Sequence, residues 1–130
     1  MAVTGPFQPR PSSRTHATVV VSTEADGLSD TINLTGLTLA SIQMSTAWTD
    51  ATIGFKGNVD GSTNYYDVYT STGVLMTYPT SANRCLSFDP APFLGLQYLQ
   101  LISETTAGVA VVQAAARTIK LGLSEVGKKS

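Results

Sequence analysis

Charged residues, cysteine, histidine and long apolar runs are all scarce in this sequence of 130 residues. Only 13% of the residues are charged and the net charge is −1, which excludes the strong basic field of a dedicated nucleic-acid-binding protein. The single cysteine excludes an intrachain disulfide framework and a multi-cysteine zinc site. The longest apolar runs, such as Val109–Val112, fall far short of the roughly 18 residues of a membrane span. We therefore expect neither a nucleic acid nor a membrane as partner.

Groups suited to acid–base catalysis are equally rare. The only histidine, His16, stands at the start of a predicted strand, and its nucleophile would have to be a serine or the distant Cys85. The oxygen-bearing residues of Asn58–Asn64 alternate as calcium ligands do, but Gly61 comes too early for an EF-hand loop, and a hairpin turn explains the segment better. We expect no catalytic residue, no metal site and no cofactor.

The N-terminal segment differs in composition from the rest of the chain. Its prolines at positions 6, 9 and 11 disfavour helix and central strand and favour an extended arm over residues 1–14. Phe7, Arg10 and Arg14 are its candidate partner contacts, with a disordered leader as the alternative interpretation. The start of the chain lacks the apolar stretch of a signal peptide, so we expect assembly in a cytoplasm.

The remainder is dominated by short segments of β-branched and alternating residues separated by turn signals. Asp60–Gly61, between two apolar stretches, is the strongest hairpin signal. One segment is ambiguous: Val109–Ala116 is rich in alanine, yet Val-Ala-Val-Val favours a strand that ends in a loop. The expected strands are 15–24, 29–35, 37–44, 51–55, 65–70, 74–78, 84–89, 97–103, 109–116 and 117–123.

These eight to ten short strands predict an all-β fold, an antiparallel β-sandwich of jelly-roll type over residues 15–123, followed by a flexible tail at 124–130. Cys85 is expected as a small core residue, and Trp48 as a lid over one end of the sandwich. Alternation along the aromatic strand places Tyr65 and Tyr69 on one face, which we expect to be exposed and to contact a partner.

The order of signals along residues 39–121 resembles small β-sandwich virion proteins of tailed bacteriophages. The resemblance is carried by turn and strand motifs, among them Trp48-x-x-Ala51-x-Ile53-x-Phe55-x-Gly57, Asp60-Gly61-Ser62-Thr63 and Gln113-Ala114-Ala115-Ala116-Arg117-Thr118-Ile119. It is strongest for the jelly-roll capsid cement, or decoration, proteins of short-tailed phages. It implies a dimer or trimer bound to the major capsid protein on the capsid exterior of a virion, with no active site.

Three functions compete at this point. The first is a structural virion protein that binds the outer surface of a bacteriophage capsid and cements neighbouring capsomers. The alternative is a carbohydrate- or receptor-binding module of a phage tail or fibre, which requires an exposed aromatic platform around Tyr65, Tyr66 or Tyr69. A small hydrolase acting through His16 ranks last.

Overall fold

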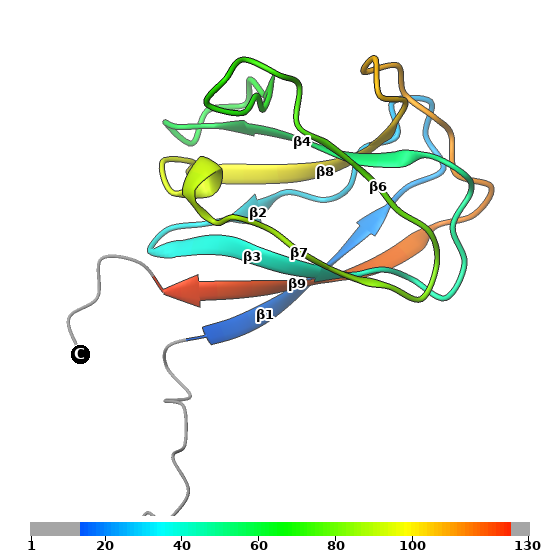
Figure 1. Cartoon of the computed structure of the whole chain (residues 1–130), viewed down its shortest axis with the longest axis horizontal. Helices are drawn as coiled ribbons and strands as arrows, with labels where there is room; N and C mark the ends of the chain where they lie inside the picture. Colours follow the sequence, from blue (N-terminus) through cyan, green and yellow to red (C-terminus); the bar gives the residue numbers. More distant parts are fainter. Residues whose placement is uncertain (1–13, 126–130) are drawn as a thin grey trace, which may run out of the picture.

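The computed structural model describes residues 14–125 of the chain, which contain nine strands and one short 3-10 helix (Figure 1). No helix in this part of the protein is long and apolar enough to cross a membrane. The elements are β1 (Arg14–Val21), β2 (Ile32–Asn33), β3 (Leu37–Gln43), β4 (Thr52–Asn58), β5 (Tyr66–Asp67), β6 (Thr77–Pro79), β7 (Cys85–Ser87), η2 (Ala91–Phe93), β8 (Tyr98–Glu104) and β9 (Arg117–Glu125).

The strands form two antiparallel sheets packed face to face (Figure 1). The four-stranded sheet has the order β1-β9-β3-β7, and the five-stranded sheet has the order β2-β8-β4-β5, with β6 also pairing to β4. The first and last strands are therefore neighbours, and most consecutive strands lie in opposite sheets. This interleaving is that of a jelly roll, which confirms the predicted fold class.

Alternation of side chains along each strand builds the core between the sheets. In β9, Ile119, Leu121 and Leu123 are buried, and in β8 the core residues are Leu99 and Leu101. Sequence alternation alone would place Ser41 beside Leu39. A register shift between Leu39 and Ser41 instead brings Ile42 into the core, because a bulge adds one residue and inverts the faces beyond it.

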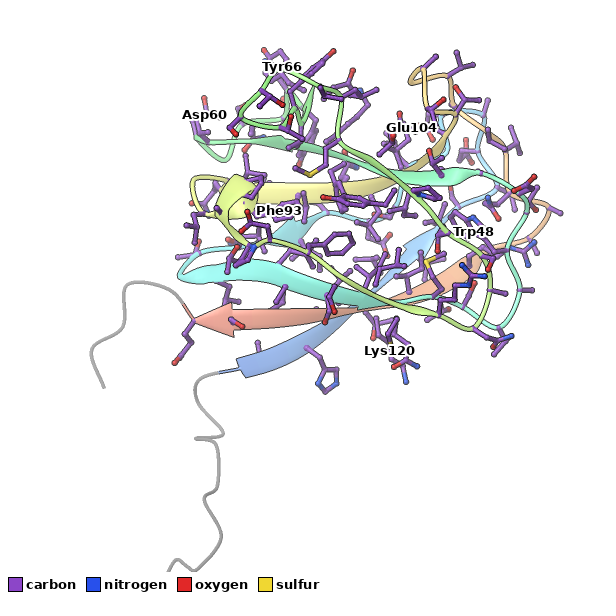
Figure 2. All side chains as sticks on the ribbon, in the orientation of Figure 1. Trp48, Asp60, Tyr66, Phe93, Glu104 and Lys120 are labelled. Atoms are coloured by element: carbon purple, nitrogen blue, oxygen red, sulfur yellow. The ribbon has the colours of Figure 1, made fainter. Side chains whose placement is uncertain are left out.

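Phe55, Tyr78, Phe88 and Phe93 form an aromatic cluster in one part of the core, where Figure 2 labels Phe93. Phe55 makes edge-to-face contacts with Tyr78, Phe88 and Phe93, at centroid separations of 6.1, 5.5 and 5.0 Å. Such contacts add about 0.5–1.5 kcal/mol each beyond the burial of the rings. Trp48 packs against the same core and donates a hydrogen bond from Nε1 to the Ala51 carbonyl oxygen at 3.1 Å, as expected of a lid.

The local predictions for Val109–Ala116 and for Cys85 are wrong. Val109–Ala116 forms no strand. Its one bridge is the isolated pairing of Ala110 with Glu104, and Val109 and Val112 are exposed rather than packed in the core. Cys85 is exposed rather than in the core, because Leu86 is the inward-facing residue of β7 and its neighbour must face out. The strands also extend beyond the expected boundaries of the sandwich, since β1 begins at Arg14 and β9 continues to Glu125.

Candidate docking surface

The most exposed large hydrophobic residues include three that surround a single groove. Val59, Tyr66 and Tyr69 are 73%, 66% and 54% exposed, and all three line a groove of about 360 Å³ on the five-stranded sheet. Pro92, within η2, and Leu96, which follows it, add further apolar walls. We call this the tyrosine groove; it is lined by Gly57, Asn58, Val59, Asp60, Tyr66, Asp67, Val68, Tyr69, Pro92 and Leu96.

The hairpin between β4 and β5 positions one wall of the groove. Asn58 is buried, and its Nδ2 donates to the carbonyl oxygens of Ser62 and Asn64 at 2.9 and 3.1 Å, while its Oδ1 accepts from the Gly61 N–H at 3.0 Å. Gly61 has a φ of 72°, a conformation that few other residues adopt. The predicted hairpin at Asp60–Gly61 is thus confirmed, and it holds Val59 at the surface.

The charged groups beside the tyrosines already have partners in the protein. Lys56 Nζ lies 2.9 Å from Asp67 Oδ1 across β4 and β5. Asp60 Oδ1 accepts the Ser62 N–H at 3.0 Å, and this hydrogen bond holds the pKa of the Asp60 carboxyl below its usual range. The groove therefore presents apolar surface with an ionised carboxylate at its rim.

The predicted contact residues are only partly brought together here. Tyr69 lines the groove, whereas Tyr65 is half-buried elsewhere, with its hydroxyl 3.2 Å from Thr31 Oγ1. Tyr66, assigned by alternation to the opposite face, is the more exposed ring. The reason is that β5 is only two residues long, so strict alternation does not extend from Tyr65 to Tyr69. Of the arm residues, Arg14 begins β1, and Phe7 and Arg10 lie outside the described residues.

His16 and Cys85 both line a second, smaller groove on the outer face of the four-stranded sheet. They belong to β1 and β7, the two edge strands, so three strand spacings of about 4.8 Å separate their backbones. That distance is too large for proton transfer between the two side chains. Ser41 is the other potential nucleophile of this groove, and no Asp or Glu is among the described residues that line it.

Glu104 is the most unusual titratable group of the sheet that carries the tyrosine groove (Figure 2). It is only 1% exposed, and neither carboxyl oxygen has a hydrogen-bond partner. Burial, with a smaller contribution from the charge of Asp67, raises the pKa of Glu104 to about 7, although Lys56 acts in the opposite direction. Its side chain fills the space above Gly54, where a Cβ atom would lie 1.8 Å from Oε2.

Within residues 14–125, no three His, Cys, Asp or Glu side chains lie close enough together to hold a metal ion. The class defined by the fold and the groove is a jelly-roll sandwich with an exposed apolar and aromatic surface on one sheet. Such a surface is suited to contact with another macromolecule.

No known family model matches the sequence, and no curated protein matches it. Among solved structures, the chain is similar to CBM32-1 from a family 31 glycoside hydrolase of Clostridium perfringens. The two share 13% identity with a TM-score of 0.39, over 82% of this chain and 76% of the other. A likeness this distant supports no functional argument for this chain.

Proposed function

We propose that this protein is a noncatalytic structural protein of a bacteriophage virion, which binds the outer surface of the capsid and cements neighbouring capsomers. The observation that carries the proposal is the tyrosine groove, where Val59, Tyr66 and Tyr69 expose a mixed aliphatic and aromatic surface to solvent. Tyrosine is enriched in protein interfaces, and exposed apolar surface is typical of a docking site. The sequence resemblance to phage decoration proteins agrees with this function.

The physical basis of cementing is mass action. A protein that binds only the assembled shell stabilises that shell relative to its separated subunits. The low charge of this chain suits it to the task, because few ions must lose their hydration when the surfaces meet. Residues 1–14, for which the sequence predicts an extended arm, are proposed to make a second contact through Phe7, Arg10 and Arg14, either with the major capsid protein or with another copy of the chain.

A carbohydrate- or receptor-binding module of a phage tail or fibre is the second candidate. The observation that favours it is the exposure of Tyr66 and Tyr69 around one groove, since stacking on aromatic rings is how many proteins hold sugars. The neighbouring polar groups favour the capsid instead. Asn58 uses its amide within the hairpin and Asp67 is paired with Lys56, so among these polar side chains Asp60 is the main one left to bind sugar hydroxyls.

The test compares wild-type protein with the double variant Tyr66→Ala/Tyr69→Ala on capsids that lack this protein. Wild-type protein should bind these capsids and raise their resistance to heat, and the variant should bind at least tenfold more weakly, as expected when two central aromatic anchors are lost. The matched control is Val109→Ala/Val112→Ala, which removes exposed apolar side chains outside the groove.

Failure of wild-type protein to bind the capsids would contradict the cementing function. A glycan array probed with the same three proteins tests the second candidate function, binding of a carbohydrate. Glycan binding that is lost only in the tyrosine variant, together with no binding to capsids, would assign the groove to a carbohydrate.

A further inference from the structure

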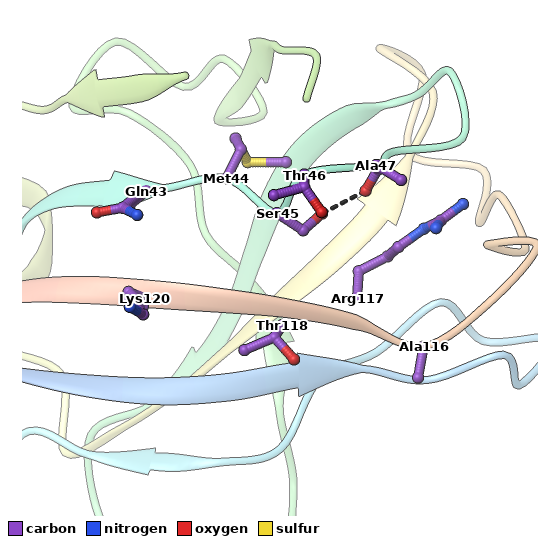
Figure 3. Close-up of a pocket in the computed structure, with 9 residues that line it drawn as sticks. All are labelled: Gln43, Met44, Ser45, Thr46, Ala47, Ala116, Arg117, Thr118 and Lys120. Carbon is purple, nitrogen blue, oxygen red and sulfur yellow. Dashed lines mark hydrogen bonds between the residues drawn. The ribbon is translucent and has the colours of Figure 1, made fainter. Parts of the chain in front are cut away.

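A third groove, of about 340 Å³, lies where β3 ends and β9 begins in the four-stranded sheet (Figure 3). It shares no lining residue with the tyrosine groove. Arg117 and Lys120 of β9 line it, together with Gln43 and the segment 44–47 that follows β3. Arg117 lies on the same face of β9 as the inward-facing Ile119, at the end of the sandwich, whereas Lys120 lies on the outer face of the strand. We call this the arginine groove.

Arg117 is held in place by a buried amide. Gln113 is fully buried, and its Oε1 accepts a hydrogen bond from Arg117 Nε at 3.1 Å and another from the Thr49 N–H at 2.8 Å. The same amide donates from Nε2 to the Thr49 carbonyl oxygen at 3.1 Å and to Ser103 Oγ at 2.8 Å. Arg117 Nη2 also donates to Thr49 Oγ1 at 3.1 Å. The guanidinium is therefore oriented before any ligand arrives.

The positive charge of this groove is not neutralised by the described part of the chain. Lys56–Asp67 is the single ion pair there, so neither Arg117 nor Lys120 has a carboxylate within 4.0 Å among residues 14–125. No Asp or Glu is among the residues that line the groove. Keeping a half-buried arginine without a counter-ion costs desolvation free energy. A ligand that supplies a carboxylate would offset this cost.

Joining the loops at Thr49 and Gln113 does not require an arginine. The guanidinium has five N–H donors, and the two hydrogen bonds from Nε and Nη2 use only two of them. The remaining donors belong to Nη1 and Nη2, the fork that binds a carboxylate through two parallel hydrogen bonds. A neutral donor would join the loops equally well at a lower desolvation cost.

We propose that the arginine groove binds the carboxylate of an acidic side chain of a partner polypeptide. Arg117 supplies the bidentate contact, and Lys120 supplies a second positive charge for a neighbouring acidic residue. No aromatic ring is among the described residues that line the groove, so it lacks the stacking platform of a sugar site. The site is independent of the tyrosine groove and stands even if that surface has another function.

The probe for this site is a short blocked peptide with the sequence Gly-Glu-Gly-Glu-Gly, titrated into full-length protein and followed by NMR. We expect shifts of the Arg117 Nε–H signal and of backbone amides in 44–47 and 116–120, weakening as salt is added. The matching Gly-Gln-Gly-Gln-Gly peptide should leave them unchanged. Equal shifts from both peptides, or none from either, would overturn the proposal. Digalacturonate that binds as well as, or better than, the acidic peptide would overturn the assignment to a polypeptide.

Two variants locate the binding. Lys120→Gln removes an exposed charge that makes no intramolecular hydrogen bond within residues 14–125, and it should weaken the acidic peptide about threefold. Arg117→Lys keeps the charge but loses the fork, and it should weaken binding about tenfold. Asn64→Asp is the control, because it changes the net charge by the same amount as Lys120→Gln at an exposed position outside the groove. Equal weakening by Asn64→Asp and Lys120→Gln would reduce the effect to overall charge and refute the site.

Discussion

At the scale of single residues, Glu104 has an environment that its sequence position does not reveal. It is the last residue of β8, a position where a glutamate would ordinarily face solvent. The structure instead covers it with the turn that contains Gly108, and Leu75 packs close to that glycine. Gly54 makes the burial possible, because any side chain there would collide with the carboxyl group. The protonation state of Glu104 must therefore influence stability.

Replacing Glu104 with glutamine should stabilise the protein at alkaline pH. The folded pKa of about 7 lies above the ordinary value of 4.5, so the unfolded chain releases its proton first as the pH rises. The contribution of this group to stability is thus most favourable below about pH 4.5, falls up to about pH 7, and is constant above it. Near pH 8 the cost approaches about 3 kcal/mol as an upper bound.

The measurement is urea unfolding of wild-type protein and Glu104→Gln from about pH 4 to pH 8. The difference between the two proteins isolates Glu104, since other groups such as Asp60 titrate in both. The gain from the variant should grow with pH and level off above neutrality. A pH-independent difference would show that the carboxyl group is not held in its neutral form.

At the scale of elements, the β4–β5 hairpin shows how a short sequence motif fixes part of the candidate surface. Asp60–Gly61 predicts the turn, but the loop of residues 59–65 is longer than a two-residue hairpin. Its conformation is set by Asn58, whose side chain bonds to three backbone groups within the loop. The turn motif alone contains no signal for this internal support.

Replacing Asn58 with alanine should destabilise the protein by roughly 2–3 kcal/mol, since the buried Asn58 side chain makes three hydrogen bonds to the backbone of the loop. The effect should be concentrated in the hairpin. Hydrogen exchange at the Gly61 amide should accelerate much more than exchange at Leu121 in β9. The variant should also weaken docking through Val59 and Asp60. Unchanged exchange at Gly61 would mean that the loop is held by other contacts.

Element boundaries also show where sequence patterns are insufficient. Alternation identified β3, β8 and β9 because long strands repeat it several times. Alternation assigned Tyr66 to the wrong face because β5 is only two residues long. It also missed the exposure of Cys85, because an alternating pattern does not say which of its two faces meets the other sheet. Thr49 bonds to Gln113 and to Arg117, which are 64 and 68 positions away, beyond the reach of any local pattern.

At the scale of the whole molecule, the fold depends on pairing between the two ends of the described chain. β1 and β9 pair along eight residues, from Arg14↔Ser124 to Val21↔Arg117. β1 contributes Val19 and Val21 to the core, and β9 links it to β3. Pairing of segments so distant in the sequence slows folding, because the long stretch of chain between β1 and β9 must be closed into a loop before the pairing stabilises the fold.

Truncation tests this dependence. A chain that lacks residues 1–13 should keep a cooperative thermal transition, because all nine strands and their core remain. A chain that lacks residues 1–21 should fail to fold, because β9 loses its edge partner and the core loses two buried valines. Circular dichroism during heating distinguishes the two. A folded product of the longer truncation would show that β1 is dispensable.

Residue composition and short-range alternation are enough to predict the fold class, the hairpin at Asp60–Gly61 and the low-charge, β-rich character of the chain. Only the tertiary structure decided that Tyr66 joins Tyr69 at one groove, that Glu104 is buried, and that Gln113 orients Arg117. Each of these depends on which distant segments meet, and that is settled by how the two sheets pack together rather than by local preference.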